Sequence, residues 1–176
     1  MSGKVEIVSL AAPIADDALG ELADVLADCV AGGASVSFMA PFPSAQALAF
    51  FRKVEGSVAK GDTVLLVASL KGKIVGTVQL GLDTPPNQPH RADIKKLLVH
   101  RRARRHGLAK ALMAAAETEA RRRGRILLTL DTQCGSTAER LYRDLGYTLF
   151  GIVPRYAVAP DGRTVDDCAF FYKALA

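Results

Sequence analysis

The chain of 176 residues has the length of a single domain that can bury a hydrophobic core, and 49% of its residues are apolar. It contains no apolar run of membrane-spanning length, and Lys4 and Glu6 interrupt what would be the apolar part of a signal peptide. Its three cysteines have no metal-type spacing, so we expect free thiols, a cytoplasmic location and no metal site. A net charge of +5 favours anionic ligands.

Hydrophobic periodicity and turn residues predict, in chain order, a strand at 5–10, helices at 14–31 and 44–59, strands at 63–70, 73–82 and 92–99, a helix at 107–123, a strand at 126–132, a helix at 135–146, and strands at 147–153 and 168–174. Ser44 is expected to cap the second helix, and Ser136 with Glu139 fits a capping box. The apolar run at 126–132 suits a strand buried on both faces. This order predicts one α/β domain over residues 1–176 with a mixed sheet.

A basic turn followed by a glycine and a helix lies at residues 97–116. Free N–H groups at a helix N-terminus bind anions, and Gly107 lets the backbone approach a ligand closely. Four arginines between residues 101 and 105 precede this helix, where the helix dipole disfavours cations. A bound polyanion such as the pyrophosphate of a coenzyme would explain them, and a basic surface loop or a nucleic-acid patch is the alternative.

Three further side chains are candidates for proton transfer. Asp93 opens the strand that leads into the basic turn, and Asp131 ends the next strand, where ligands bind in α/β sheets. Either carboxylate could deprotonate an amine, although Asp93 could instead pair with Arg91 or Lys95, and Asp131 could be a turn or helix-capping residue. The Tyr142 hydroxyl could protonate a thiolate, or the residue could belong to the core.

Two segments in this order are together distinctive: RRHGLA at 104–109 and AERLYRDLGY at 138–147. The first is similar to the R/Q-x-x-G-x-G/A coenzyme signature of the GCN5-related N-acetyltransferase (GNAT) family, and the second to its later A-x-x-LY-x-x-x-GF segment. The sequence therefore resembles this family. Further similarity to its tabtoxin-resistance branch is found at 32–39, 91–99, 130–139, 156–163 and 169–175.

The resemblance implies an α/β (α+β) fold with a twisted, mostly antiparallel sheet of about six to seven strands and four flanking helices. It also implies an acyltransferase that moves an acetyl group from acetyl-CoA to the primary amine of a small amino-acid-like acceptor, for example a tabtoxin-like toxin, within a ternary complex. The partner is then a small molecule rather than nucleic acid or a membrane, with homodimer formation left open.

The family's site residues transfer to this sequence position by position. The resemblance implies that Asp93 and Asp131 act as bases, Tyr142 as the general acid, and the main chain of Leu97, Leu98 and Val99 as the partner of pantetheine. It implies that the pyrophosphate site comprises Arg104, Arg105, His106, Gly107, Leu108, Ala109 and Lys110. Ser37, Phe38 and Met39, in a glycine-containing loop, are candidates for selecting the acceptor by shape.

Three positions depart from the family pattern. Arg105 replaces a glycine of the typical turn, and Asp93 is one methylene shorter than the glutamate of the tabtoxin-resistance branch, which favours a water relay. Gly135 replaces an asparagine that contacts pantetheine in many members, so this contact passes to Ser136. A nucleic-acid binder, a non-catalytic acyl-CoA-binding protein, and an acetyltransferase for aminoglycosides or peptide N-termini are the alternative functions.

Overall fold

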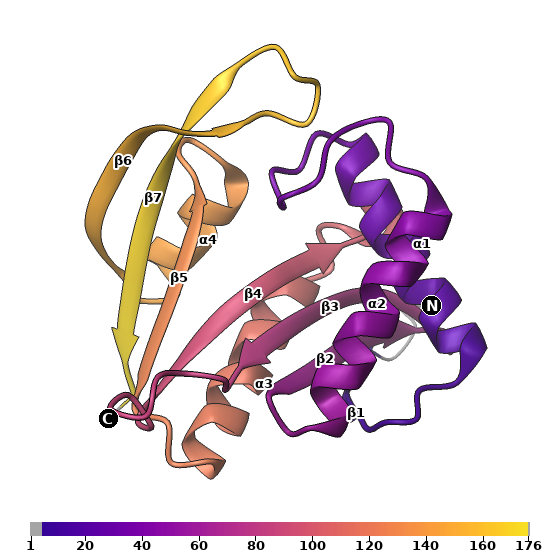
Figure 1. Ribbon diagram of the computed structural model, residues 1–176, viewed down its shortest axis with the longest axis horizontal. Coiled ribbons are helices and arrows are strands. Elements are labelled where there is room, and N and C mark those ends of the chain that lie inside the picture. Colours follow the sequence, from indigo (N-terminus) through magenta and orange to yellow (C-terminus); the bar gives the residue numbers. More distant parts are fainter. Residues whose placement is uncertain (1–4, 176) are drawn as a thin grey trace.

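The computed structural model describes residues 5–175 and contains one seven-stranded sheet with four α-helices (Figure 1). The elements in chain order are β1 (Val5–Leu10), α1 (Asp16–Ala31), α2 (Ser44–Ala59), β2 (Thr63–Leu70), β3 (Lys73–Gly81), β4 (Arg91–Val99), a short 3₁₀ helix (Arg101–Ala103), α3 (Leu108–Arg122), β5 (Leu127–Gln133), α4 (Thr137–Asp144), β6 (Thr148–Val158) and β7 (Val165–Ala174). This is the predicted order, and the α/β fold with a mostly antiparallel sheet is confirmed.

The strand order is β1-β2-β3-β4-β5-β7-β6, and every neighbouring pair except β4 and β5 is antiparallel. The parallel pair is short, because the ladder joins only residues 91–93 of β4 to residues 127–129 of β5. Beyond that point the two strands diverge, so the sheet divides into a β1–β4 half and a β5–β7–β6 half (Figure 1). The edge of β4 that faces β5 therefore has no strand partner over residues 94–99.

Helices cover the two faces of the sheet unequally. Helices α1 and α2 pack on one face of β2–β4, in a core that contains Leu22, Phe51 and Val67. Helices α3 and α4 pack on the other face, where Leu112 and Phe171 are fully buried. Within residues 5–175, the half formed by β5, β7 and β6 has no helix on the α1–α2 side (Figure 1).

Several predicted boundaries differ from the structure. The first helix begins at Asp16 rather than residue 14, and Pro43, not Ser44, is the N-terminal flanking residue of α2. The prediction that the strand at 126–132 is buried on both faces is wrong, since only Leu128 and Leu130 of β5 are buried and Asp131 is exposed. The cause is the divergence of β4, which uncovers one face of β5. No helix within residues 5–175 is long and apolar enough to cross a membrane.

Candidate active site

The free edge of β4 offers main-chain groups to a ligand. The amide of His100 donates to Val75 O at 2.8 Å, toward β3. Because successive amides of a strand point to opposite edges, the Val99 amide points toward β5, where β4 has lost its partner. The carbonyl of Val99 on this edge accepts from Arg104 Nε at 3.3 Å and from Cys29 Sγ at 3.5 Å. The Val99 N–H thus remains the available group at this position.

The N-terminus of α3 presents backbone donors without a partner among the described residues. Gly107, with φ of +73°, precedes the helix and provides no side-chain cap. Among the described residues, the first amide of α3 that donates a hydrogen bond is that of Ala111, which donates to Gly107 O at 3.0 Å. The amides of Leu108, Ala109 and Lys110 therefore keep their donors for a ligand. A Cβ atom at Gly107 would meet no protein atom within 4 Å, so the outer side of the turn is open.

A shallow cavity of about 190 Å³ lies at this helix end. Its walls are formed by Val99, Ala103, Arg104, Arg105, Gly107, Leu108, Ala109, Lys110 and Leu141. Amide donors at a helix N-terminus and three flanking cations are the donor set that a diphosphate requires, so these residues fit the pyrophosphate of coenzyme A. His106 does not line the cavity, because its Nδ1 contacts Ala103 O at 3.2 Å and Arg104 O at 2.9 Å.

The first two arginines of the basic turn are held by α1 instead. Arg101 binds Asp28 through its backbone amide at 2.8 Å and its Nε at 2.9 Å. Arg102 lies 3.5 Å from Asp24, one turn earlier in α1. Burial opposes ionisation of Asp28, but the hydrogen bonds from Arg101 outweigh it and lower the pKa of this carboxyl. These arginines therefore anchor the turn, which leaves Arg104 and Arg105 to face the ligand.

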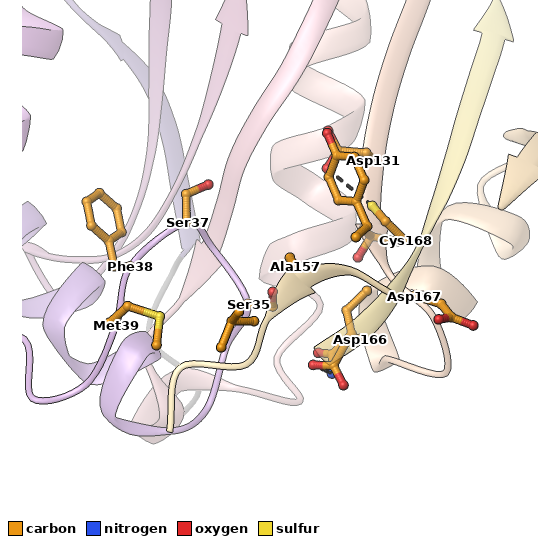
Figure 2. Close-up of a pocket in the computed structure, with 13 residues that line it drawn as sticks. Ser35, Ser37, Phe38, Met39, Asp131, Ala157, Asp166, Asp167 and Cys168 are labelled. Atoms are coloured by element: carbon orange, nitrogen blue, oxygen red, sulfur yellow. Dashed lines mark hydrogen bonds between the residues drawn. The ribbon is translucent and has the colours of Figure 1, made fainter. Parts of the chain in front are cut away.

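A second cavity, of about 280 Å³, lies between the α1–α2 loop and the far ends of β5, β6 and β7 (Figure 2). It is lined by Ser35, Ser37, Phe38, Met39, Asp131, Thr132, Gln133, Tyr156, Ala157, Val158, Asp166, Asp167 and Cys168. The amide of Ala40 donates to Pro160 O at 2.8 Å, which joins the loop to the β6–β7 turn. The structure thus brings Asp131 together with the three loop residues proposed from the sequence, and we call this cavity the acceptor pocket.

Asp131 and Cys168 lie next to each other in the acceptor pocket (Figure 2). The Cys168 thiol donates to Asp131 Oδ2 at 3.5 Å. Burial and the charge of Asp131 raise the pKa of this thiol to about 12. Cys168 therefore stays protonated and acts as a hydrogen-bond donor rather than as a nucleophile.

Asp93 does not line the acceptor pocket. Its carboxylate is bound by Arg91 and by the hydroxyl of Thr129, its register partner on β5. Asp93 and Asp131 belong to the same face of the sheet, since Asp131 follows Thr129 by two strand residues. The structure thus contains the Asp93–Arg91 ion pair that the sequence left as an alternative. Asp93 lies where β4 and β5 are still paired, whereas Asp131 lies beyond the point where the two strands diverge.

The side chain of Tyr142, on α4, is buried in the hydrophobic core. Its side chain packs against Tyr147 and Phe171, with ring centroids 5.8 Å and 6.3 Å away. The hydroxyl forms no hydrogen bond to a residue of the described chain, and the pKa of Tyr142 is raised by burial and then by the charge of Asp131. A neutral phenol with an unused donor near Asp131 suits a general acid.

The turn before α4 explains one departure from the family pattern. Gly135 has φ of +74°, a conformation that favours glycine, and its amide donates to Glu139 Oε2 at 2.6 Å. Ser136 Oγ accepts from Glu139 N at 3.1 Å, so the predicted capping box forms in a variant that uses the Gly135 amide. The Ser136 hydroxyl is therefore already engaged at the helix end.

Several pocket residues were not predicted. Tyr156 lies beyond Pro154 in a part of β6 that the sequence assigned to a loop, and Asp166 and Asp167 precede the predicted start of the last strand. Lys96 has a left-handed backbone at φ of +51° and contacts the pocket loop, which no sequence pattern indicated. The sequence signal that could have placed these residues is the expectation that the last two strands pair next to the strand that carries Asp131.

Comparison with known proteins agrees with this geometry. A sequence model of the acetyltransferase (GNAT) family matches residues 33–147. An uncharacterized N-acetyltransferase from the hisH–hisA intergenic region of Azospirillum brasilense is 34% identical over 117 residues, which cover 65% of this chain and 68% of that protein. The chain therefore belongs to the GNAT acetyltransferase family, whose members use acetyl-CoA.

Solved structures show the same fold at low sequence identity. A ribosomal-protein-alanine N-acetyltransferase from Brucella melitensis aligns with a TM-score of 0.79 and 22% identity over 97% of this chain and 99% of that one. A putative acetyltransferase from Salmonella typhimurium, solved with acetyl-CoA, aligns with a TM-score of 0.77 and 20% identity over 98% of this chain and 94% of that one. At these identities the likeness extends to the fold alone.

Proposed function

We propose that this protein transfers an acetyl group from acetyl-CoA to the primary amine of a small, amino-acid-like acceptor, in a direct reaction between two bound substrates. The observation that carries the proposal is the position of Asp131, which lies near the C-terminal end of the diverging strand β5 and also lines the acceptor pocket. A tabtoxin-like toxin is the acceptor that the sequence resemblance favours, and acetylation of its amine would confer resistance.

The coenzyme side of the site is assigned to the divergence and to α3. The amides of residues 108–110 with Arg104, Arg105 and Lys110 would hold the pyrophosphate, and the free edge of β4 at Leu97–Val99 would pair with the pantetheine arm. Acetyl-CoA supplies an activated acetyl thioester when it is bound. The Val99 amide points into the divergence and would donate to the oxygen on which negative charge develops.

Proton transfer is assigned to three side chains. An amine is protonated and not nucleophilic at neutral pH, so Asp131 would remove its proton, with Cys168 holding the carboxylate in place. Asp93, held by Arg91, is the second acid and would act through a water relay. The Tyr142 hydroxyl would return a proton to the departing sulfur.

The proposal is tested by thiol release from acetyl-CoA in the presence of amino acids, a tabtoxin-like amino acid, aminoglycosides and short peptides. We expect turnover with amino-acid-like amines. Asp131→Asn should lower kcat by about 10²- to 10⁴-fold and leave the Kd for acetyl-CoA within about threefold, because Asp131 lies outside the coenzyme cavity. Asp83→Asn, the same change in an exposed loop, is the control. Binding of acetyl-CoA without turnover of any amine would indicate a non-catalytic acyl-CoA-binding protein.

A further inference from the structure

We propose that Lys96 binds the carboxylate of the acceptor, so that the site takes zwitterionic α-amino acids in preference to amines that lack an acid group. This inference rests on the proposed acetyl transfer and identifies the residue that determines its acceptor class. It starts from a contact that joins β4 to the acceptor pocket.

The backbone of β4 is irregular at Lys96. The pairing with β3 shifts between Thr77 and Gln79, where residues 96 and 97 together oppose Val78. Lys96 itself has φ of +51°, a left-handed conformation that costs a residue other than glycine about 1 kcal/mol or more. A bulge of this kind redirects a side chain out of the regular alternation, and here it directs Lys96 toward the α1–α2 loop.

The ammonium group of Lys96 lies beside two residues that line the acceptor pocket. Its Nζ donates to Ser37 Oγ at 3.0 Å and lies 5.5 Å from the centre of the Phe38 ring. Ser37 and Phe38 both line the pocket. No carboxylate within residues 5–175 forms an ion pair with this nitrogen. The neutral Ser37 hydroxyl is its one hydrogen-bond acceptor among these residues, and its other two N–H groups are left for a ligand.

Lys96 is half-buried, and a cation in such a position usually has an anionic partner close by. Desolvation lowers the pKa of Lys96, and the positive charge of Lys95 lowers it further. The negative charge of Asp131 opposes both effects and raises it in part. Partly dehydrated cations in proteins normally have an anionic partner. Since residues 5–175 supply only the more distant Asp131, an anionic group of the ligand is the partner that would complete the site.

The charges around the pocket match those of an α-amino acid. Asp131 would receive the ammonium group and Lys96 the carboxylate, which places opposite charges on opposite walls. The other two carboxylates of the pocket have their own donors, because Asp166 accepts from Gln133 Nε2 and Asp167 from the Arg155 amide, each at 2.8 Å. The volume of about 280 Å³ is below the range of about 300–1,000 Å³ that holds drug-sized ligands, which favours a small acceptor.

The test compares each amino acid with its α-carboxamide, which keeps the amine and removes the negative charge. With wild-type protein we expect kcat/KM to be about 10- to 100-fold higher for the acid, as expected for one charged hydrogen-bonded contact. Lys96→Gln, which keeps a donor for Ser37, should abolish this preference mainly through KM, and Lys96→Arg should retain most of it. Lys95→Ala removes the same charge from the exposed neighbouring residue and should preserve the preference.

The outcomes separate this inference from the acetyltransferase proposal. Equal turnover of acids and carboxamides by the wild-type protein would overturn the role of Lys96 and leave acetyl transfer intact. An equal loss on both substrates in Lys96→Gln would show that Lys96 supports the loop or the reaction rather than recognising a carboxylate. Absence of acetyl transfer to every amine would overturn both.

Discussion

The thiol of Cys168 donates a hydrogen bond to Asp131 Oδ2 at 3.5 Å, on the wall of the acceptor pocket. The pKa of this thiol is raised to about 12, mainly by burial and secondly by the negative charge of Asp131. At pH 8 only about one thiol in ten thousand is then ionised. An acetyl-cysteine intermediate is therefore disfavoured, and direct transfer between bound substrates is favoured.

We accordingly expect the intact mass of the protein to stay unchanged during incubation with acetyl-CoA alone. Cys168→Ser keeps a donor for Asp131 and should keep kcat within about threefold, whereas Cys168→Ala removes it and should lower kcat by about tenfold. Mass spectrometry and steady-state kinetics provide the measurements. An acetylated Cys168 peptide, or a serine variant as impaired as the alanine variant, would contradict this role.

Tyr142 provides a second test of the proton path. Because its pKa is raised by burial and by Asp131, the phenol should remain protonated up to and beyond pH 10, so it should cause no alkaline fall in kcat below that pH. Tyr142→Phe should lower kcat by about 10²-fold. It should change the free energy of unfolding by less than about 1 kcal/mol, since the hydroxyl forms no hydrogen bond within residues 5–175.

The control for this change is Tyr147→Phe, on the buried ring 5.8 Å away, which should leave kcat unchanged. The raised pKa also gives a stability signature. The unfolded chain releases the Tyr142 proton near pH 10 and the folded chain only above it, so the stabilisation is complete below pH 10 and decreases as the pH rises further. Full activity of Tyr142→Phe would remove the tyrosine from the mechanism.

Local sequence signals predicted most of the fold. The strand at 63–70 was predicted with its observed bounds, and the capping signal at Ser136 and Glu139 correctly located the start of α4. The end of β6 was missed, because Pro154 is normally incompatible with a paired strand. An edge strand tolerates it, and the pairing of β6 with β7 is irregular between Val153 and Ala157.

The site was predicted less completely, because its parts meet through long-range geometry. The sequence placed Asp131 and Gly107 as candidates near the ends of elements, and the structure brings Asp131 to the acceptor pocket and Gly107 to the N-terminus of α3. The bulge at Lys96 follows from how β3 and β4 pair, and no periodicity encodes it. Alternation along β4 cannot choose between Arg91 and Lys95 as the partner of Asp93, since both lie two residues from it on the same face, and the structure pairs Asp93 with Arg91.

Asp28 tests whether α1 supports the coenzyme turn. Its side chain is 11% exposed and binds both the backbone and the guanidinium of Arg101. Asp28→Asn should lower the free energy of unfolding by about 1–3 kcal/mol and weaken acetyl-CoA binding, because the turn loses its anchor. Asp24→Asn affects a contact of 3.5 Å to the half-exposed Arg102 and one of 3.4 Å to His100, and should cost less than about 1 kcal/mol.

The Asp28 effect should depend on pH in a defined direction. Its folded pKa is lowered by the Arg101 hydrogen bonds, against the opposing effect of burial. The stabilisation is therefore present above the unfolded value of about 3.9 and is lost as the pH falls through the folded value. Urea unfolding of the wild-type and variant proteins at pH 7 and at pH 3 should show a smaller difference at acidic pH. A difference that is independent of pH would contradict the ion pair.

Arg105 places a positive charge at the proposed coenzyme cavity, and its backbone has a left-handed conformation, with φ of +66°, that is unfavourable for residues other than glycine. Glycine, which is typical of this family position, adopts that conformation freely, although it gains more entropy on unfolding. Arg105→Gly should therefore leave the free energy of unfolding unchanged or raise it by up to about 1 kcal/mol. Its Kd for acetyl-CoA should nevertheless increase by about threefold to tenfold, because an exposed cation of the cavity is lost.

Arg105→Ala separates the two effects, since it removes the same charge but keeps a Cβ atom in the left-handed conformation. We expect it to weaken acetyl-CoA binding as much as the glycine variant, without any gain in stability. The loss in affinity should shrink at high salt, where the interaction of an exposed cation with a phosphate is screened. If the alanine variant instead binds acetyl-CoA as tightly as the wild-type protein, Arg105 has no role as a phosphate ligand.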